Sequence, residues 1–276
     1  MKRVLASMSI LLLSSAAWAD PTTQPADSSS SSPWSISAQV TDTSAYFFRG
    51  DNQGDDNHLI IQPELTIGYS FYSSDKQLTI TPYLDLWGNL TDKHFGNEDN
   101  WFNELDITPG VEFKTGRVDF SVEAITYYSP VDAFKLYEEG GFKLGFDDTG
   151  LTPLPFALNP HLDAYQQITR TADNAPMGSY MELGLAPLFN IAKLPMTVTI
   201  PVTLGTSLQH YYHDAAGADQ FVGFGSAGVL VTWNVTDHWS IAGGADYYRL
   251  FAQNLIDDNN GDHSTVVGHM TLGYSY

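Results

Sequence analysis

The stretch Leu194–Tyr212, LPMTVTIPVTLGTSLQHYY, alternates apolar residues with residues that carry hydroxyl groups or small side chains. Successive side chains of a β-strand point to opposite faces, so this pattern predicts a strand with one apolar face and one polar face. The stretch is roughly three times as long as the usual strand of about five or six residues. A tilted strand of about 9–11 residues crosses a bilayer, so a strand of this length can span a membrane and project beyond it.

The same alternation recurs along the rest of the chain, whereas sustained helical periodicity appears nowhere in it. In residues 58–72, for example, Leu65 and Ile67 share one face while Glu64 and Thr66 take the other. We therefore predict twelve strands in one all-β domain. They cover residues 34–49, 58–72, 77–90, 101–114, 117–129, 137–147, 154–168, 178–191, 194–212, 220–234, 238–251 and 265–276.

The connections between these strands alternate in length. Tight turns such as residues 73–76 and 114–117 alternate with longer loops such as Gly50–Asn57 and Ala252–Ser264, which are rich in Asp, Asn and Gly. Outer-membrane barrels have short periplasmic turns, longer external loops and an even number of strands. The fold class that we predict is a transmembrane, antiparallel, up-and-down β-barrel of about twelve strands, with both termini in the periplasm.

The N-terminus has the three parts of a secretory signal peptide. Lys2 and Arg3 precede the mostly apolar run Val4–Leu13, and Ala17-Trp18-Ala19 fits the cleavage rule. We expect cleavage after Ala19, export, and a final location in the outer membrane of a diderm bacterium. Because the chain contains no cysteine, lipoprotein modification is excluded.

The predicted domains follow from these boundaries. Residues 1–19 are the signal peptide, and residues 20–33 are a Ser- and Pro-rich linker with almost nothing to bury, which predicts disorder. Residues 34–276 are the barrel. No segment after the signal peptide approaches the ~18 apolar residues of a membrane helix, so a membrane location requires a closed barrel.

The charge of the chain excludes one class of partner. The 32 acidic residues outnumber the 12 basic ones and give a net charge of −20. Nucleic-acid binding needs a basic surface that releases counterions, so no nucleic-acid partner is expected.

Aromatic residues gather near the ends of the predicted strands. Tyr and Trp rings suit the headgroup level of a membrane, which predicts two girdles, although aromatic residues are also common in ordinary strands. The predicted girdle residues are Trp34, Tyr69, Phe71, Trp101, Tyr128, Tyr212, Trp233, Trp239, Tyr274 and Tyr276.

The last predicted strand, VVGHMTLGYSY, places Met270, Leu272 and Tyr274 on one face and ends on the aromatic residue Tyr276. This ending resembles the C-terminal signal by which bacterial outer-membrane proteins are recognised for insertion. The predicted partners are therefore outer-membrane lipid and the barrel-insertion machinery, with small solutes as candidates for transport.

Acidic residues dominate the face predicted to point into the barrel, where Lys114, Arg117 and Lys143 are among the few opposing bases. A barrel of about eight strands is filled by its own side chains, whereas one of about 16–18 strands encloses an aqueous channel. A barrel of twelve strands falls between these two cases. A water-filled acidic lumen favours cations and neutral solutes, whereas a salt-bridge network that plugs the lumen is the alternative. The predicted lumen residues are Arg49, Glu64, Asp85, Glu104, Asp106, Glu112, Asp119, Glu123, Asp163, Glu182 and Asp246.

Two charges of the first predicted strand require separate accounts. Arg49 lies just before the first long loop, where Glu64 or another inward acid can pair with it, so a structural clamp is favoured over a selectivity role. Asp42 falls on the outward phase set by Val40. A charge facing lipid is costly, so we expect a β-bulge near residues 41–44 that resets the phase.

The residues that an enzyme needs are present, but no spacing joins them. His161, His210, His213 and His269 are candidate bases, and no arrangement in the sequence singles out a triad. No catalytic residue is predicted, and the protein is expected not to be an enzyme.

The acidic loops at residues 51–57, 97–100 and 257–262 offer oxygen ligands that suit divalent cations. In the last loop the Gly and the acids miss the EF-hand register. Solvated loops are the simpler interpretation, so neither a metal nor a cofactor is predicted.

One segment resembles a known family. Residues 45–50, AYFFRG, resemble the Y-x-F-R-G segment of an uncharacterised bacterial outer-membrane barrel family, Gcw_chp-like, and Asn52-Gln53-Gly54 is similar to the Gln-containing polar loop that follows it. Residues 84–89, LDLWGN, resemble the family's third strand. The match covers about residues 44–90, and the family's more usual Ile-Ser-Gln after Arg-Gly is missing. The resemblance implies an outer-membrane barrel and brings no established activity.

These patterns lead to two main hypotheses. The first is a narrow, porin-like channel for passive diffusion of small cationic or neutral solutes. The alternative is a non-conducting barrel that binds a ligand, an envelope component or a partner through its external loops. A hydrolase is a distant third.

Overall fold

Twelve antiparallel strands form the wall of a closed barrel, and each strand pairs with its neighbours along the chain. The computed structural model describes residues 32–54, 58–73, 78–92, 101–151, 154, 156–170 and 176–276. The predicted signal peptide lies outside these residues, as does the predicted linker apart from Ser32 and Pro33. The fold class predicted from the sequence is confirmed.

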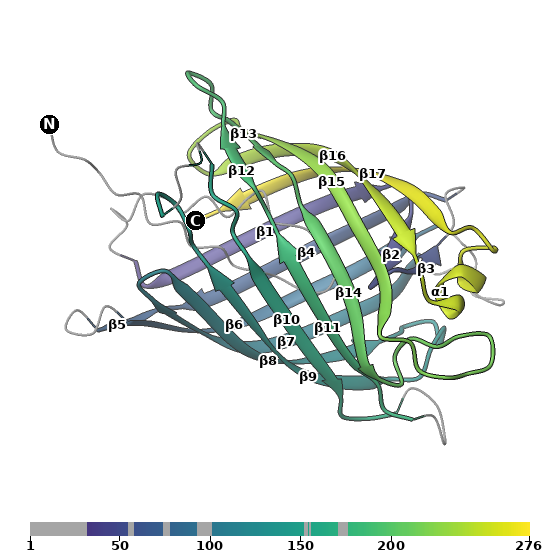
Figure 1. The fold of residues 1–276 in the computed structure, drawn as a ribbon. Helices are drawn as coiled ribbons and strands as arrows, with labels where there is room; N and C mark the ends of the chain where they lie inside the picture. The colour runs from purple at the N-terminus through teal and green to yellow at the C-terminus, as the bar shows by residue number, and fades with distance from the viewer. Residues whose placement is uncertain are drawn as a thin grey trace, which may run out of the picture.

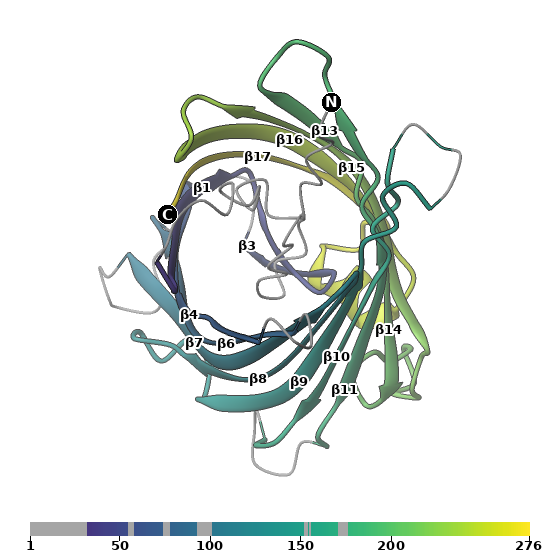
Figure 2. The same cartoon turned by 90° about the vertical axis from the view of Figure 1, so that its left-hand side faces the viewer.

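The barrel closes at its first strand. β1 (Trp34–Thr43) pairs with β4 (Ile60–Tyr69) along one edge and with β17 (Ser264–Ser275) along the other. Figure 1 shows the barrel from the side, and Figure 2 shows it from one end. The other wall segments are β5 (Phe71–Ser73), β6 (Leu78–Thr91), β7 (Phe102–Thr115), β8 (Val118–Tyr128), β9 (Tyr137–Phe146), β10 (His161–Gln167), β11 (Ser179–Leu185), β12 (Leu188–Asn190), β13 (Met196–Thr199), β14 (Val202–Gln209), β15 (Val222–Asn234) and β16 (Trp239–Leu250).

The alternation that predicted these strands sets the two faces of the wall. On β14, the side chains of Val202, Leu204 and Leu208 are exposed on the outside, whereas Thr203 and Ser207 are buried inside. An apolar outer surface of this kind suits lipid, because a bilayer core solvates apolar side chains and no unpaired polar backbone. The apolar face of β14 is the exposed outer face, and its inner face is polar. The strand is therefore part of a membrane wall.

The long predicted strand at 194–212 is interrupted in the middle. β13 pairs with β12 and β15, and β14 pairs with β11 and β15, with Ile200 and Pro201 between them. Pro201 has no N–H for the ladder, and Pro187 interrupts the neighbouring predicted strand at the same level. The Ile200 amide donates to the Pro187 carbonyl at 2.9 Å, which keeps the two breaks together.

The first strand ends earlier than predicted. Its pairing with β4 runs without a shift from Trp34 opposite Tyr69 to Thr43 opposite Ile60, so the expected bulge near residues 41–44 is wrong. Asp42 stays on the outer face, exposed, one residue before the strand ends. The strand therefore accommodates this charge by ending there, at the edge of the wall.

Connections at the two ends of the barrel differ as predicted, with one exception. The chain turns tightly between β7 and β8 and between β15 and β16, at the end where β1 begins and β17 stops (Figure 1). At this same end the predicted strand at 154–168 begins only at His161, which leaves a longer connection after β9. The Asp148 carboxylate accepts hydrogen bonds from the amides of Leu158 and Asn159 at 2.8 Å, so this connection is held together internally.

The outer aromatic residues lie near the two rims, with one correction. Trp34 contacts Tyr69 and Trp239 contacts Tyr274 at the short-turn end, with ring centroids 4.9 and 5.1 Å apart. Tyr212 is fully buried and its hydroxyl donates to the Arg49 carbonyl, so its predicted place in a girdle is wrong. β14 ends at Gln209, and the chain then turns inward. The girdle residues with exposed side chains are Trp34, Phe71, Trp101, Tyr128, Trp233, Trp239 and Tyr276.

The long-loop end contains folded structure that the sequence analysis assigned to a strand end and to loops. β2 (Tyr46–Phe48) and β3 (Asp51–Gly54) pair as a separate hairpin, which we call the inner hairpin, and α1 (Gln253–Asp258) contacts β3. Both views place the hairpin within the ring of strands (Figures 1 and 2). In the described part of the chain, no helix is long and apolar enough to cross a membrane.

Candidate functional site

The inner hairpin turns at Arg49 and Gly50, and both residues have positive φ, 51° and 84°. A two-residue hairpin turn of this geometry favours Asn or Gly at the first position. A left-handed conformation costs a residue with a Cβ roughly 1–2 kcal/mol. The contacts of the Arg49 side chain offset this cost. A side chain at Gly50 would be strained by its φ and would place its Cβ 2.6 Å from Phe224, so Gly50 fits the tip of the hairpin against the wall.

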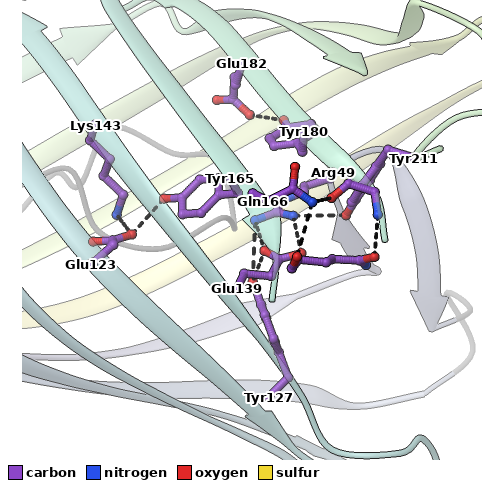
Figure 3. Close-up of polar contacts among 12 residues, drawn as sticks. Arg49, Glu123, Tyr127, Glu139, Lys143, Tyr165, Gln166, Tyr180, Glu182 and Tyr211 are labelled. Carbon is purple, nitrogen blue, oxygen red and sulfur yellow. Dashed lines mark hydrogen bonds and ion pairs between the residues drawn. The ribbon is translucent and has the colours of Figure 1, made fainter. Parts of the chain in front are cut away.

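The Arg49 side chain is completely buried and forms a two-pronged ion pair with Glu139 of β9 (Figure 3). Nη2 donates to one carboxylate oxygen at 2.7 Å and Nη1 donates to the other at 3.1 Å. Nη1 also donates to the Tyr211 hydroxyl at 3.1 Å, and Nη2 approaches the Tyr127 hydroxyl at 3.4 Å. Such planar, paired contacts are the strongest that a guanidinium makes with a carboxylate.

Aromatic rings enclose the same guanidinium. Its Cζ lies 4.4 Å from the ring centre of Tyr180, 4.5 Å from that of Tyr165 and 5.5 Å from that of Tyr211. Phe48 of the hairpin itself approaches to 4.8 Å. A cation within about 6 Å of an aromatic face is attracted by the ring quadrupole, more strongly where water is excluded. The wall residues that surround the guanidinium, which we call the Arg49 cage, are Tyr127, Glu139, Tyr165, Tyr180 and Tyr211.

The cage residues come from β8, β9, β10, β11 and the segment after β14, and each is held by contacts with the wall. Tyr127 donates to Glu139 at 3.1 Å, and its ring stacks on Tyr137 at 4.3 Å. Tyr165 donates to Glu123 at 2.7 Å and lies across Gly141, where a Cβ would come within 2.3 Å of its ring. Tyr180 donates to Glu182. The cage is therefore held in place by residues other than Arg49.

Around the cage, the hairpin and α1 share a buried cluster with the inner wall at the long-loop end. These apolar contacts pack the tip of the hairpin against the inner wall. The buried members of the cluster are Ala45, Tyr46, Phe47, Phe48, Ile60, Trp87, Ile125, Tyr127, Tyr165, Tyr180, Tyr212, Phe224, Tyr248, Leu250, Ala252, Leu255, Ile256 and Val267.

Polar contacts join the hairpin to α1. The Asn52 amide donates to the Asn259 side chain at 3.2 Å. Asp51 lies within hydrogen-bonding reach of Asp258, and burial together with this second acid raises the pKa of Asp51 from its ordinary 3.8 to about 7. Burial also raises the pKa of Asp258. One proton shared between the two carboxyl groups therefore stabilises the contact between the hairpin and the helix.

The predicted lumen acids lie on the inner wall, buried or half-buried. Glu123 pairs with Lys143 at 3.0 Å and accepts from Tyr83 and Tyr165. Further lumen contacts link Glu64 with Gln39, Asp85 with Thr66, Asp119 with Lys114 and Asp246 with His269.

Other carboxylate oxygens on the inner wall are less well satisfied. Among the described residues, one oxygen each of Asp85, Asp106 and Asp163 is buried without a hydrogen-bond partner. Buried carboxylates normally find donors, so this part of the lumen has more acceptors than the wall satisfies. The electrostatics of the inner wall therefore favour positive charge or a hydrogen-bond donor there.

Arg49 was predicted to pair with Glu64 or another inward acid, and it pairs with Glu139 of β9. Glu139, its partner, was missed, as were the roles of Tyr127, Tyr165, Tyr180 and Tyr211. Alternation supplied a signal for Glu139, since it lies two and four positions before Gly141 and Lys143 on the inward phase of β9. Arg49 reaches Glu139 only because the chain turns inward after Thr43.

The structure assembles no metal centre in the residues that it describes, as no group of three or more His, Asp or Glu side chains there is placed to hold an ion. Parts of the predicted acidic loops, residues 55–57 and 97–100, lie outside the described residues. Of the histidines, His210 contacts Asp219 at 3.1 Å on the exposed surface, and His269 contacts Asp246 at 3.2 Å inside.

Solved structures that resemble this chain are outer-membrane barrels. An outer-membrane channel from Pseudomonas putida F1 matches with a TM-score of 0.51 and 11% identity, over 88% of this chain and 94% of that one. The porin NanC matches with a TM-score of 0.48 and 10% identity, over 87% and 98%. The outer-membrane phospholipase of Salmonella typhi matches with a TM-score of 0.47 and 12% identity, over 86% and 89%. Identities this low establish the fold alone.

Fold and comparison together place the chain among the outer-membrane-type β-barrels. No protein-family model matches the chain, and no curated protein matches it. The resemblance to the Gcw_chp-like family therefore stays a prediction. The expectation that this protein is not an enzyme also stays a prediction.

Proposed function

We propose that this barrel is a narrow outer-membrane channel for passive diffusion of small cationic or neutral solutes. The observation that carries the proposal is the charge of the inner wall. The predicted lumen acids line it, together with Glu139, and bases that contact them in the described part of the chain include Arg49, Lys114, Lys143 and His269. An acidic lumen concentrates cations and repels anions.

The inner hairpin supports the restriction to small solutes. It lies within the ring of strands and packs into a buried cluster at the long-loop end, so it takes up part of the cross-section there. By the rule for outer-membrane barrels this is the external end, with the termini in the periplasm. A cleaved signal peptide and recognition of the C-terminal strand by the barrel-insertion machinery complete the proposal for its route to the membrane.

Recordings from planar lipid bilayers test the proposal. In a salt gradient, the reversal potential of the wild-type channel should show preference for K⁺ over Cl⁻. Replacing the inward pair Asp85 and Asp106 by Asn should reduce this preference, because both acids have a buried, unpartnered oxygen on the inner wall. Glu138→Gln, on the opposite face of β9, is the matched control. Anion preference, or silence from well-folded wild-type protein, contradicts the proposal.

The buried cluster favours one alternative, a non-conducting barrel that binds a ligand, an envelope component or a partner through its external loops. The cluster joins the hairpin and α1 into a folded surface at the barrel mouth. Replacing residues 45–54 by a short Gly-Ser linker separates the two functions. A channel should conduct better without its hairpin, whereas the alternative predicts an inserted barrel without current in either form.

A further inference from the structure

We propose that the Arg49 cage is a binding site for a guanidinium-bearing organic cation, which Arg49 occupies in the structure and which a solute displaces. The inference deepens the proposed function and rests on it, since it names the class of solute. The site and its occupant belong to different parts of the fold. The wall supplies Tyr127, Glu139, Tyr165, Tyr180 and Tyr211, whereas Arg49 reaches them from the inner hairpin (Figure 3).

The geometry of the cage selects a guanidinium. The two oxygens of Glu139 face the two Nη atoms at 2.7 and 3.1 Å, and the hydroxyls of Tyr127 and Tyr211 lie on the outer sides of the same pair. A planar guanidinium donates in this fork-like pattern, whereas an ammonium presents a point charge that cannot match both oxygens equally. The rings of Tyr165 and Tyr180 add cation–π attraction at 4.5 and 4.4 Å.

Three tyrosines of the cage are held in place by contacts that do not involve Arg49. Glu123 holds the Tyr165 hydroxyl, Glu182 holds the Tyr180 hydroxyl, and Tyr127 is held between Glu139 and the ring of Tyr137. All of these contacts lie within the barrel wall. A site whose side chains are fixed before binding loses little conformational entropy when a ligand arrives, so the vacated cage retains affinity.

Arg49 is an imperfect occupant. Its Nε–H is buried without a hydrogen-bond partner, and an unpaired buried donor is destabilising. Its backbone also has a positive φ. A free guanidinium that is not tethered to the turn can occupy the cage without this backbone strain. Displacement then releases the tip of the hairpin from the lumen.

Binding to a vacated cage is the first test. The Arg49→Ala protein in detergent should bind ethylguanidinium saturably in titration calorimetry, and binding should raise its Tm. Ethylammonium tests the need for the fork, and urea tests the need for charge, so both should bind at least about tenfold more weakly. Adding Glu139→Gln to Arg49→Ala should weaken ethylguanidinium binding by a similar factor. Absence of saturable binding, or equal binding of urea, overturns the proposal.

The second test uses the wild-type protein and does not depend on the folding of a variant. Ethylguanidinium should accelerate hydrogen–deuterium exchange in residues 45–54 and increase the bilayer conductance, whereas ethylammonium at the same ionic strength should do neither. Unchanged exchange in ethylguanidinium shows that Arg49 is a permanent structural clamp and overturns the proposal. If wild-type protein conducts cations but no cage binding is found, only this inference fails. If the cage binds ethylguanidinium while no form of the barrel conducts, the proposed channel fails instead.

Discussion

At the scale of single residues, Arg49 decides how the long-loop end is built. Its side chain satisfies Glu139, contacts two tyrosine hydroxyls and lies against three rings of the wall. The Arg49 side chain is buried at the turn of the inner hairpin, two positions before Asp51. Its burial ties the short hairpin to the far side of the barrel. Sequence periodicity indicated that Arg49 points inward and needs an acid. It did not indicate which acid, because the chain bends out of the strand before reaching it.

Removing the charge of Glu139 should release the hairpin. Glu139→Gln leaves the Arg49 guanidinium buried without its carboxylate, and breaking a buried ion pair on one side costs about 3–5 kcal/mol. Because the wall strands keep their ladder, we expect the hairpin to undock while the barrel stays folded. Hydrogen–deuterium exchange of residues 45–54 should rise strongly in this variant and remain unchanged in the control Glu138→Gln. Equal protection of the hairpin in both variants contradicts this account.

The contact between Asp51 and Asp258 should make hairpin docking depend on pH. Burial and Asp258 raise the pKa of Asp51 to about 7 in the folded protein, against 3.8 in an open chain. The docked state therefore binds a proton more tightly, and its stability is complete at pH below 3.8 and decreases as the pH rises through about 7. Asp51→Asn should keep the hairpin protected above pH 7, as measured by exchange of residues 45–54 across this range. A pH profile that is the same in both proteins would count against the shared proton.

At the scale of elements, alternation predicted the wall well because each strand buries one face and exposes the other. It predicted the ends of the elements poorly. Residues 46–54 continue an aromatic and polar sequence that looks like a strand followed by a loop, and only tertiary packing against Phe224 and Leu255 turns it into an inward hairpin. Pro187 and Pro201 fall inside strands that were predicted to be continuous, and their alignment on adjacent strands depends on register, which one strand alone does not determine.

The outer face of β14 should be sensitive to charge. Leu204 is exposed in the middle of the strand, between Val202 and Leu208 on the same face. Leu204→Arg places a charge toward lipid, which costs about 2–4 kcal/mol near the membrane midplane. Reversible unfolding in lipid vesicles should show this loss, and Gln209→Arg, at the long-loop end of the same strand, should cost about 1 kcal/mol or less. Equal costs at the two positions would place Leu204 outside the membrane.

At the scale of the whole molecule, the barrel separates an apolar outside from an acidic inside. The net charge of −20 is therefore not spread evenly, because a lipid-facing band accepts few charges and concentrates them in the lumen and the loops. Composition alone excluded nucleic acid as a partner. The location of the acidic residues, in contrast, could be determined only from the fold. Lys143 pairs with Glu123 and also interacts electrostatically with Asp163 and Asp85, so a single base serves several acids of the lumen.

Salt should weaken the proposed cation preference of the barrel. Screening shortens the range of the lumen charges from about 10 Å at 0.1 M to about 3 Å at 1 M salt. The reversal potential for a fixed concentration ratio should therefore approach zero as the total salt rises. A selectivity that does not change with ionic strength would indicate direct coordination of ions in place of a field from the acidic wall.

The inner hairpin also has a consequence for assembly. It follows β1 directly, and its tip touches side chains of β8 to β11, while Phe47 stacks on Tyr248 of β16 at 4.9 Å. In the closed barrel, where β1 pairs with β17, these strands surround the tip. Docking of the hairpin therefore indicates that the barrel has closed with the correct pairing of its strands. A barrel that has not closed should therefore be recognisable by an Arg49 side chain that is not bound in its cage.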